Sequence, residues 1–263
     1  MSNADTVIAA LRTGYDGLAD LVKKFSDDDL AGPSAATEWD IAQVLSHLGS
    51  GSEIMRTTVQ AALDGKPGPD GDFNQTVWDR WNASSRREQA DGFLEKNEQL
   101  VALFESLDAD QRENLRLDLS YAPAPVDVAT IGRGRLSEFT LHSWDIRSAL
   151  DPQATLDPQA VPELLQSSGD LLAWISKPAV LGGKSTDLSV VTTAPASELT
   201  LHLTDPVSID LAPADQPDGT LTLPGEVWLR LVSGRLAPTQ TSGTVELTGP
   251  VTLETLREVF PGY

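Results

Sequence analysis

The chain has 263 residues, a formal net charge of −20 and a pI near 4.3, and it contains no cysteine. The negative charge argues against a nucleic-acid partner and against binding to anionic membranes. The lack of cysteine excludes a disulfide framework, thiolate metal ligands and a cysteine nucleophile of the protein's own. The first twenty residues are neither basic nor continuously apolar, and no apolar run has the length of a membrane span, so we expect a cytoplasmic location without a signal peptide.

Apolar residues recur at three- and four-residue steps through the first two thirds of the chain, which predicts the helices of a bundle. Thr37 and Asp40 provide a start resembling a capping box for the second helix. Proline and glycine predict a loop at 66–72 and a linker at 151–158, and Pro123 and Pro125 favour an extended segment at 121–126. The predicted helices are 8–25, 37–55, 73–87, 89–107, 134–149 and 161–175.

From Asp187 the pattern changes to an alternation of apolar and polar residues with period two, bounded by Pro, Gly and Asp. This alternation predicts the short strands of a half-buried antiparallel sheet, covered on one face by helices at 226–233 and 253–259. We therefore expect an α plus α+β architecture, with a helical bundle at 1–180 and a small α+β domain at 186–263. The predicted strands are 188–192, 199–203, 207–211, 220–223 and 244–247.

Three residues of the predicted bundle have the chemistry of metal ligands. Glu138 and His142 are four apart, so they lie one turn apart on one helical face, and His47 lies in the apolar face of the second helix. A carboxylate and two imidazoles are the donors of a catalytic zinc site, and Asp145 could add a fourth ligand or orient a histidine. The three side chains could instead satisfy one another by hydrogen bonds in the bundle interior, and the spacing alone leaves both interpretations open.

Small residues follow His47 directly, at Gly49, Ser50 and Gly51. They lower helix propensity, and one use for that cost is room beside the histidine for a ligand or a neighbouring helix. His202, in contrast, alternates with leucines in a predicted strand, so we expect it to point out of the sheet and assign it no role.

Several motifs resemble a known family. The pattern TEWDIAQVLSHL, followed later by RLSEFTLHSWDI, resembles the DinB-like four-helix bundle family, and in particular its mycothiol-dependent maleylpyruvate isomerase branch. VWLRLVSGRLAP and GTVELTGPVTLETLREVFPGY resemble the second domain of that branch, a small α+β module with a sterol-carrier-like fold. The resemblance implies metal ligands at His47, Glu138 and His142, zinc or another divalent metal as cofactor, and the thiol mycothiol as cosubstrate.

The implied activity is attack of an external thiol on an electrophilic small molecule, as an isomerase or as an S-transferase. A dicarboxylate substrate of an isomerase would need cationic anchors, and arginine binds carboxylates in a bidentate way. Arg80, Arg135 and Arg235 are the candidate anchors. Of the site residues, Arg80, Arg235 and Asp145 are candidates for catalysis, and Arg135 and Arg230 for binding the cosubstrate. A salt bridge is the competing interpretation for each arginine, and the net charge of −20 mildly favours a transferase with a less charged electrophile.

Two hypotheses from other classes compete with an enzyme. One is a metal-binding stress or regulatory protein without catalysis, and the other is a lipid- or ligand-binding module whose C-terminal domain does the binding. The expected partners are a small electrophile and a thiol, with neither nucleic acid nor membrane. The sequence leaves open whether the protein is a monomer or a homodimer.

Overall fold

A computed structural model describes residues 3–119, 122, 124–166, 172, 175–240 and 245–262. The chain divides into two compact units, 1–160 and 161–263, whereas the sequence placed the boundary at 180–186. The division falls earlier because α8 (Val161–Leu165) packs against α10 (Gly225–Val232) of the second unit, where Val161 and Leu165 closely approach Gly225.

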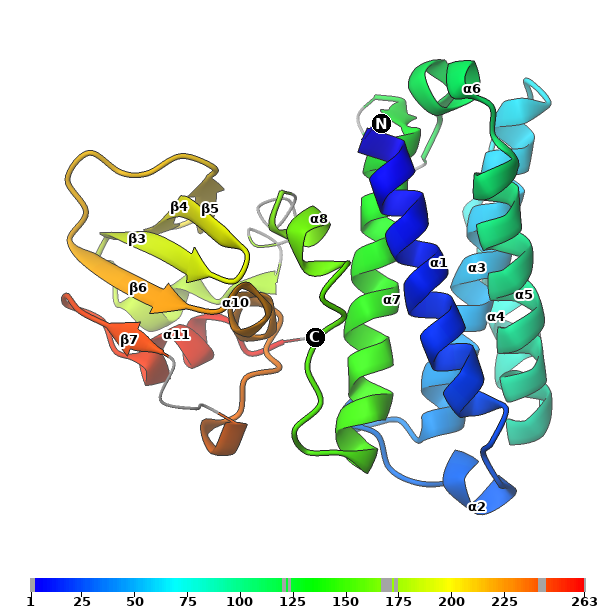
Figure 1. Cartoon of the computed structure of the whole chain (residues 1–263), viewed down its shortest axis with the longest axis horizontal. Coiled ribbons are helices and arrows are strands. Elements are labelled where there is room, and N and C mark those ends of the chain that lie inside the picture. The colour runs from blue at the N-terminus through cyan, green and yellow to red at the C-terminus, as the bar shows by residue number, and fades with distance from the viewer. Residues whose placement is uncertain are drawn as a thin grey trace. The chain divides into compact units, whose positions relative to one another are not determined.

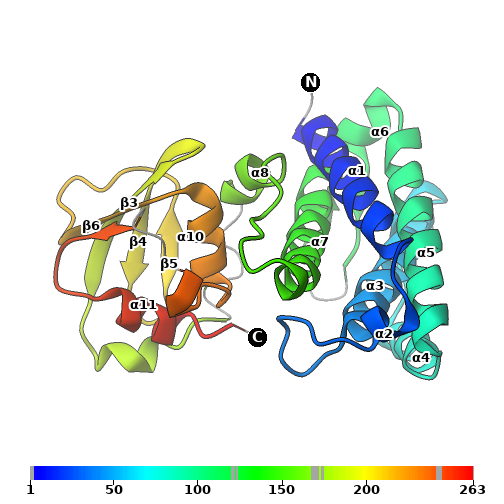
Figure 2. The ribbon, with the colours of Figure 1, turned by 60° about the horizontal axis from the view of Figure 1, so that its bottom comes forward.

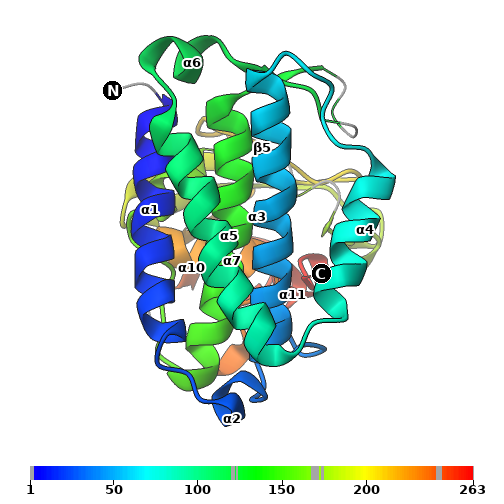
Figure 3. The same ribbon diagram turned by 90° about the vertical axis from the view of Figure 1, so that its right-hand side faces the viewer.

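The first unit is a helical bundle in which α1, α3, α5 and α7 run alongside one another (Figures 1 and 3). Its interior is apolar and aromatic, as the predicted stripes require: the ring of Phe93 lies 6.3 Å from that of Tyr15 and 6.3 Å from that of Phe139. The elements of this unit are α1 Asn3–Val22, α2 Asp27–Leu30, α3 Ile41–Leu63, α4 Gly71–Asn82, α5 Arg86–Ser106, α6 Ala109–Asn114, β1 Arg116–Leu117, β2 Val126–Asp127 and α7 Val128–Leu150.

Two helices begin at other residues than predicted. The N-cap of α3 is Asp40, which exchanges hydrogen bonds with Gln43, so the predicted start at Thr37 is wrong. Asp40 and Gln43 form a complete capping box, which is a stronger signal for a helix start than Thr37, three residues earlier. Helix α7 begins at Val128, before the predicted Gly134, because Asp127 caps it by accepting a hydrogen bond from the Thr130 amide.

The second unit contains a five-stranded sheet of order β5-β4-β3-β6-β7. Neighbouring strands are antiparallel except β3 and β6, which pair in parallel, so the sheet is mixed and not antiparallel throughout as predicted. Alternate residues of β3 and β6 are buried, and α10 packs against β3 (Figure 2). Its elements are α8 Val161–Leu165, η1 Pro178–Leu181, β3 Thr186–Thr193, β4 Ala196–Leu203, β5 Ser208–Asp210, β6 Gly219–Leu223, α10 Gly225–Val232, η2 Pro238–Gln240, β7 Glu246–Leu247 and α11 Leu253–Val259.

Some expectations fall on residues outside the described ones. These are most of the predicted helix after 166, part of the extended segment at 121–126, and the first residue of the last predicted strand, Thr244. Within the described part of the chain, no helix is both long enough and apolar enough to cross a membrane.

His202 lies between two carboxylates on the sheet. Its Nδ1 is 2.8 Å from Asp187 Oδ1 and its Nε2 is 3.2 Å from Asp210 Oδ2. The hydrogen bond with Asp187 raises the pKa of His202 above its ordinary value of 6.5; burial lowers it by less, and Asp210 adds to the rise. The charged imidazolium therefore favours the folded state: this contribution is complete below about pH 6.5 and is lost as the pH rises through the folded-state pKa.

We expect Asp187→Asn to lower the pKa of His202, measured by NMR titration of the imidazole. The native chain should be more stable than this variant below about pH 6.5 by under ~1 kcal/mol, because the pair is partly exposed, and the difference should shrink at higher pH. Asp215→Asn, which removes an exposed carboxylate that forms no hydrogen bond with His202, is the control. An unchanged His202 pKa in Asp187→Asn would contradict the assignment.

Candidate metal centre

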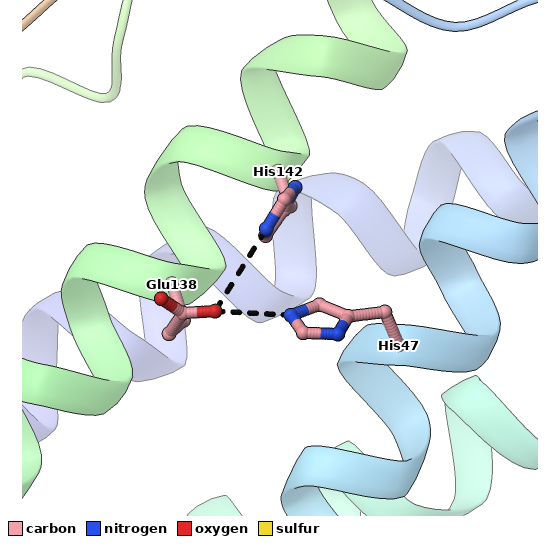
Figure 4. Close-up of side chains that lie close together, drawn as sticks. All are labelled: His47, Glu138 and His142. Atoms are coloured by element: carbon pink, nitrogen blue, oxygen red, sulfur yellow. Dashed lines mark hydrogen bonds and ion pairs between the residues drawn. The ribbon is translucent and has the colours of Figure 1, made fainter. Parts of the chain in front are cut away.

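The structure brings the three predicted ligands together from two helices of the bundle (Figure 4). His47 comes from α3, and Glu138 and His142 come from α7. Glu138 Oε2 lies 3.0 Å from His47 Nε2 and 3.8 Å from His142 Nε2, and one ligand atom from each residue lies within 4.8 Å of the others. Bonds from zinc to such atoms are about 2.0–2.2 Å long, so one divalent ion can be reached by all three.

Asp145 lies behind His142 and not beside the other ligands. Its Oδ2 is 2.9 Å from Nδ1 of His142, and both side chains are buried. A hydrogen bond from Nδ1–H to this carboxylate orients the ring so that Nε2, the atom that could bind a metal, faces Glu138. Of the two roles predicted for Asp145, the geometry fits orientation of the histidine and not a fourth ligand.

The ring of Trp39 covers both imidazoles. Its centroid is 5.2 Å from that of His47 and 5.9 Å from that of His142. The loop that carries Trp39 is fixed at two points, because Ser34 Oγ donates to the Trp39 carbonyl and the Ala35 amide donates to the Asp145 carbonyl on α7. Trp39 therefore forms an apolar wall of the site, which limits the access of water to the two rings.

Glu138 is held in its charged form. Burial would raise its pKa, but the hydrogen bond with His47 and the charges of His142, His47 and Arg135 outweigh burial and lower it below the ordinary value. About a third of the Glu138 and His47 side chains stays exposed, at 37% and 36%, while His142 is almost fully buried. The site thus combines one fixed imidazole with two donors that an incoming ligand can reach.

Arg135, one turn before Glu138 on α7, is buried in a network that joins three helices. Its Nη2 donates to the carbonyl of Leu48 at 2.6 Å, to Ser52 Oγ at 2.7 Å and to Asn97 Oδ1 at 2.8 Å. Burial lowers the pKa of Arg135 to about 10, so it remains a cation at neutral pH. Because Leu48 adjoins His47, this network sets the distance between the α3 and α7 donors.

Of the two uses predicted for the small residues after His47, room for a ligand or for a neighbouring helix, the structure shows the second at the two glycines. A Cβ on Gly49 would overlap the Trp81 ring, so this glycine lets α4 pack against α3. A Cβ on Gly51 would lie 3.0 Å from Nη1 of Arg135. Both glycines therefore serve helix packing around the site.

The other predicted arginines have partners on their own elements or on neighbouring ones. Arg80, partly exposed on α4, donates to Glu53 of α3, which also accepts from Trp81 Nε1 at 3.0 Å. Arg230 is buried and makes a bidentate pair with Glu226 on α10, at 2.8 and 2.9 Å. Arg235 is half-buried and donates to the Ser233 carbonyl at 3.1 Å. Their predicted roles toward substrate or cosubstrate stay predictions.

Sequence reasoning missed two contributors to the site, and each had a signal. Trp39 directly precedes the N-cap Asp40, a position from which large apolar residues commonly pack back on the structure. Asn97 interrupts the apolar stripe of α5 between Phe93 and Leu100, and a polar residue in a core position indicates a buried hydrogen-bond partner.

Comparison with known proteins identifies a family for residues 11–147 and a similar fold for the chain. Residues 11–147 match the family model described as the mycothiol maleylpyruvate isomerase N-terminal domain. The crystal structure of the mycothiol-dependent maleylpyruvate isomerase resembles the chain with a TM-score of 0.63 at 12% sequence identity, covering 95% of each chain. A mutant of that enzyme with a histidine replaced by alanine gives the same values. No curated protein matches significantly by sequence.

We expect Glu138→Ala to abolish metal binding and to leave the bundle folded. The apolar interior does not need a metal to form, so metal should raise the melting temperature only by mass action. Metal content of tag-free protein and circular dichroism measure the two effects, with Glu95→Ala, on the exposed face of α5, as the control. Complete unfolding of the metal-free native chain at room temperature would instead identify a structural site.

We expect Arg135→Leu to lower the free energy of unfolding by about 3 kcal/mol, because the carbonyl of Leu48 and the side chains of Ser52 and Asn97 lose a buried charged donor. Urea unfolding followed by circular dichroism measures the change. Arg116→Gln is the control, since exposed Arg116 forms its hydrogen bonds within the described residues with backbone carbonyls near it in the chain. A loss in Arg135→Leu no larger than in the control would show that the network does not hold the helices.

Proposed function

Because the chain belongs to the family of the mycothiol maleylpyruvate isomerase N-terminal domain, we propose that it is a divalent-metal-dependent enzyme that uses mycothiol to attack an electrophilic small molecule. The observation that carries this proposal is the convergence of His47, Glu138 and His142 inside the matched region. We propose zinc as the metal, with another divalent cation as the alternative. A cytoplasmic location and a monomeric or homodimeric state are part of the same proposal.

The donor set suits the proposed metal and the proposed cosubstrate. Two imidazoles and one carboxylate are the protein ligands of catalytic zinc sites, and His142 already has the buried carboxylate partner that such histidines require. A divalent cation bound there supplies an open position at which a thiol is deprotonated at neutral pH. The chain has no cysteine, so the sulfur nucleophile must come from outside.

The residues around the ligands divide the remaining work. Asp145 orients His142 so that Nε2 faces Glu138, and Trp39 excludes water from one side of the two imidazoles. We propose that Arg135 acts by holding α3 against α7 and not by touching the cosubstrate, because its Nη2 is already shared by three acceptors. Arg80 and Arg235 remain the proposed anchors for a substrate carboxylate, and Arg230 a proposed contact of the cosubstrate.

The isomerase and the S-transferase begin with the same bond. In both, the thiol sulfur adds to an electron-poor carbon. In the isomerase the carbon is part of a cis double bond: rotation follows the addition, the carbon–sulfur bond then breaks, and the thiol is released unchanged. In the transferase the bond persists and the thiol is consumed. Measuring free mycothiol during turnover therefore separates the two activities.

We expect mycothiol to bind metal-loaded protein far more tightly than metal-stripped protein, measured by calorimetric titration of both forms. His47→Ala should remove metal and activity together.

Arg235→Gln should weaken turnover and leave metal content unchanged, because we propose that Arg235 positions the substrate and does not bind the metal.

Equal affinity of mycothiol for the two forms would show that the thiol does not use the metal, and the mechanism would have to be withdrawn. A metal-loaded chain that consumes no electrophile with mycothiol present would favour the non-catalytic metal-binding alternative. A chain that binds no divalent metal would favour the ligand-binding module.

A further inference from the structure

A cavity lies within the first unit, on the face of α7 that points away from the metal ligands. Nine residues separate Glu138 from Arg147, which at 3.6 residues per turn places them on opposite sides of the helix. The cavity has a volume of about 200 Å³. It is lined by α1, by α7 and by residues 155–158, and its lining includes Gly14, Phe139, Thr140, Ser143, Trp144 and Arg147.

Arg147 brings a half-buried positive charge to this cavity. Its Nε is 3.4 Å from Ser143 Oγ, and among the described residues no carboxylate forms an ion pair with it. Burial lowers the pKa of Arg147, and the more distant charge of Asp157 opposes that shift without a direct contact. A buried charge without a direct counter-ion is costly, so the guanidinium is poised to accept an anion.

Two glycines of α1 let Arg147 and Phe139 approach this helix closely at the cavity. A Cβ on Gly17 would lie 3.1 Å from Nη2 of Arg147, and a Cβ on Gly14 would lie 3.5 Å from the Phe139 ring. Glycine in a helix interior costs roughly 0.5–1 kcal/mol relative to alanine. That cost allows the guanidinium and the ring to lie close to the α1 backbone at this cavity.

We propose that this cavity binds a small monocarboxylate with an aromatic or apolar body. The carboxylate would be bound by Arg147, with the hydroxyls of Ser143 and Thr140 as further donors, and the body would pack against Phe139, Trp144 and Leu156. The volume exceeds the roughly 150 Å³ of an apolar cavity that accepts benzene. Arg147 is the one cationic residue among the described residues of the lining, and it can neutralise one carboxylate. Asp157 also lines the cavity and would repel a second negative charge on the ligand.

The cavity at Arg147 differs from the proposed active site in the ligand that it favours. It does not depend on a metal or on a thiol, and it disfavours the dicarboxylates that an isomerase of this family would take. The ligand would contact both α7 and the segment 155–158, which leads directly into the second unit at Val161.

The test uses calorimetry on the full-length, metal-free protein with benzoate as the probe. Benzoate should bind at one site, and neutral benzamide and dianionic phthalate should bind at least about tenfold more weakly. Arg147→Gln should lose at least about tenfold in benzoate affinity, and Ser143→Ala should lose less. Arg116→Gln, which removes the same charge from an exposed position, and His47→Ala should bind as the native chain does.

The proposal is overturned if native protein shows no saturable binding at about 10 mM benzoate, or if Arg147→Gln binds benzoate as tightly as Arg116→Gln does. Loss of binding in His47→Ala would move the ligand to the imidazoles and would also overturn it. If circular dichroism shows that Arg147→Gln does not fold, Ser143→Ala decides: weaker binding supports the site, and unchanged binding contradicts it. None of these results bears on the thiol chemistry, so the two proposals fail separately.

Discussion

The buried guanidinium of Arg135 is the constraint on which the site depends. Apolar contacts are not directional, so packing of leucine and phenylalanine alone leaves helices some freedom in their relative register. One nitrogen that donates to a backbone carbonyl of α3, a serine of α3 and an asparagine of α5 removes that freedom. The acceptor on α3 is the residue next to His47, so the network sets the separation of the histidine from Glu138.

The same constraint explains which part of the site could be predicted from the sequence. The pairing of Glu138 with His142 follows from helical geometry alone, since four residues make one turn. The approach of His47 to that pair depends on the register between two helices, which no single-helix pattern encodes. Family resemblance supplied that step, and in the structure Arg135 and Asn97 maintain it. Trp39 was missed because its part arises from a loop folded back onto α7.

For the fold, the sequence likewise predicted the individual elements but not how all of them pair. Periodicity identified the bundle helices and the strands of the second unit, because burial of one face leaves a repeat in the sequence. It could not show that β3 and β6 pair in parallel, since alternation encodes which face is buried and not which strand lies alongside. The predicted start of α3 was wrong because two possible caps, Thr37 and Asp40, lie close together. Asp40 is the N-cap, since it exchanges hydrogen bonds with Gln43.

Helix α7 carries two arginines whose environments differ in kind. Arg135 donates hydrogen bonds to three oxygen acceptors inside the protein, and the negative charge of Glu138 lies close enough to stabilise its cationic form. Arg147 has a distant carboxylate and a single long hydrogen bond. In a chain with a net charge of −20 the long-range field opposes the approach of any anion. An anionic ligand is therefore held best where a cation lies at short range and is partly buried, and Arg147 meets both conditions. One face of α7 is thus organised to gather donors for a cation, and the opposite face to leave a cation unmatched.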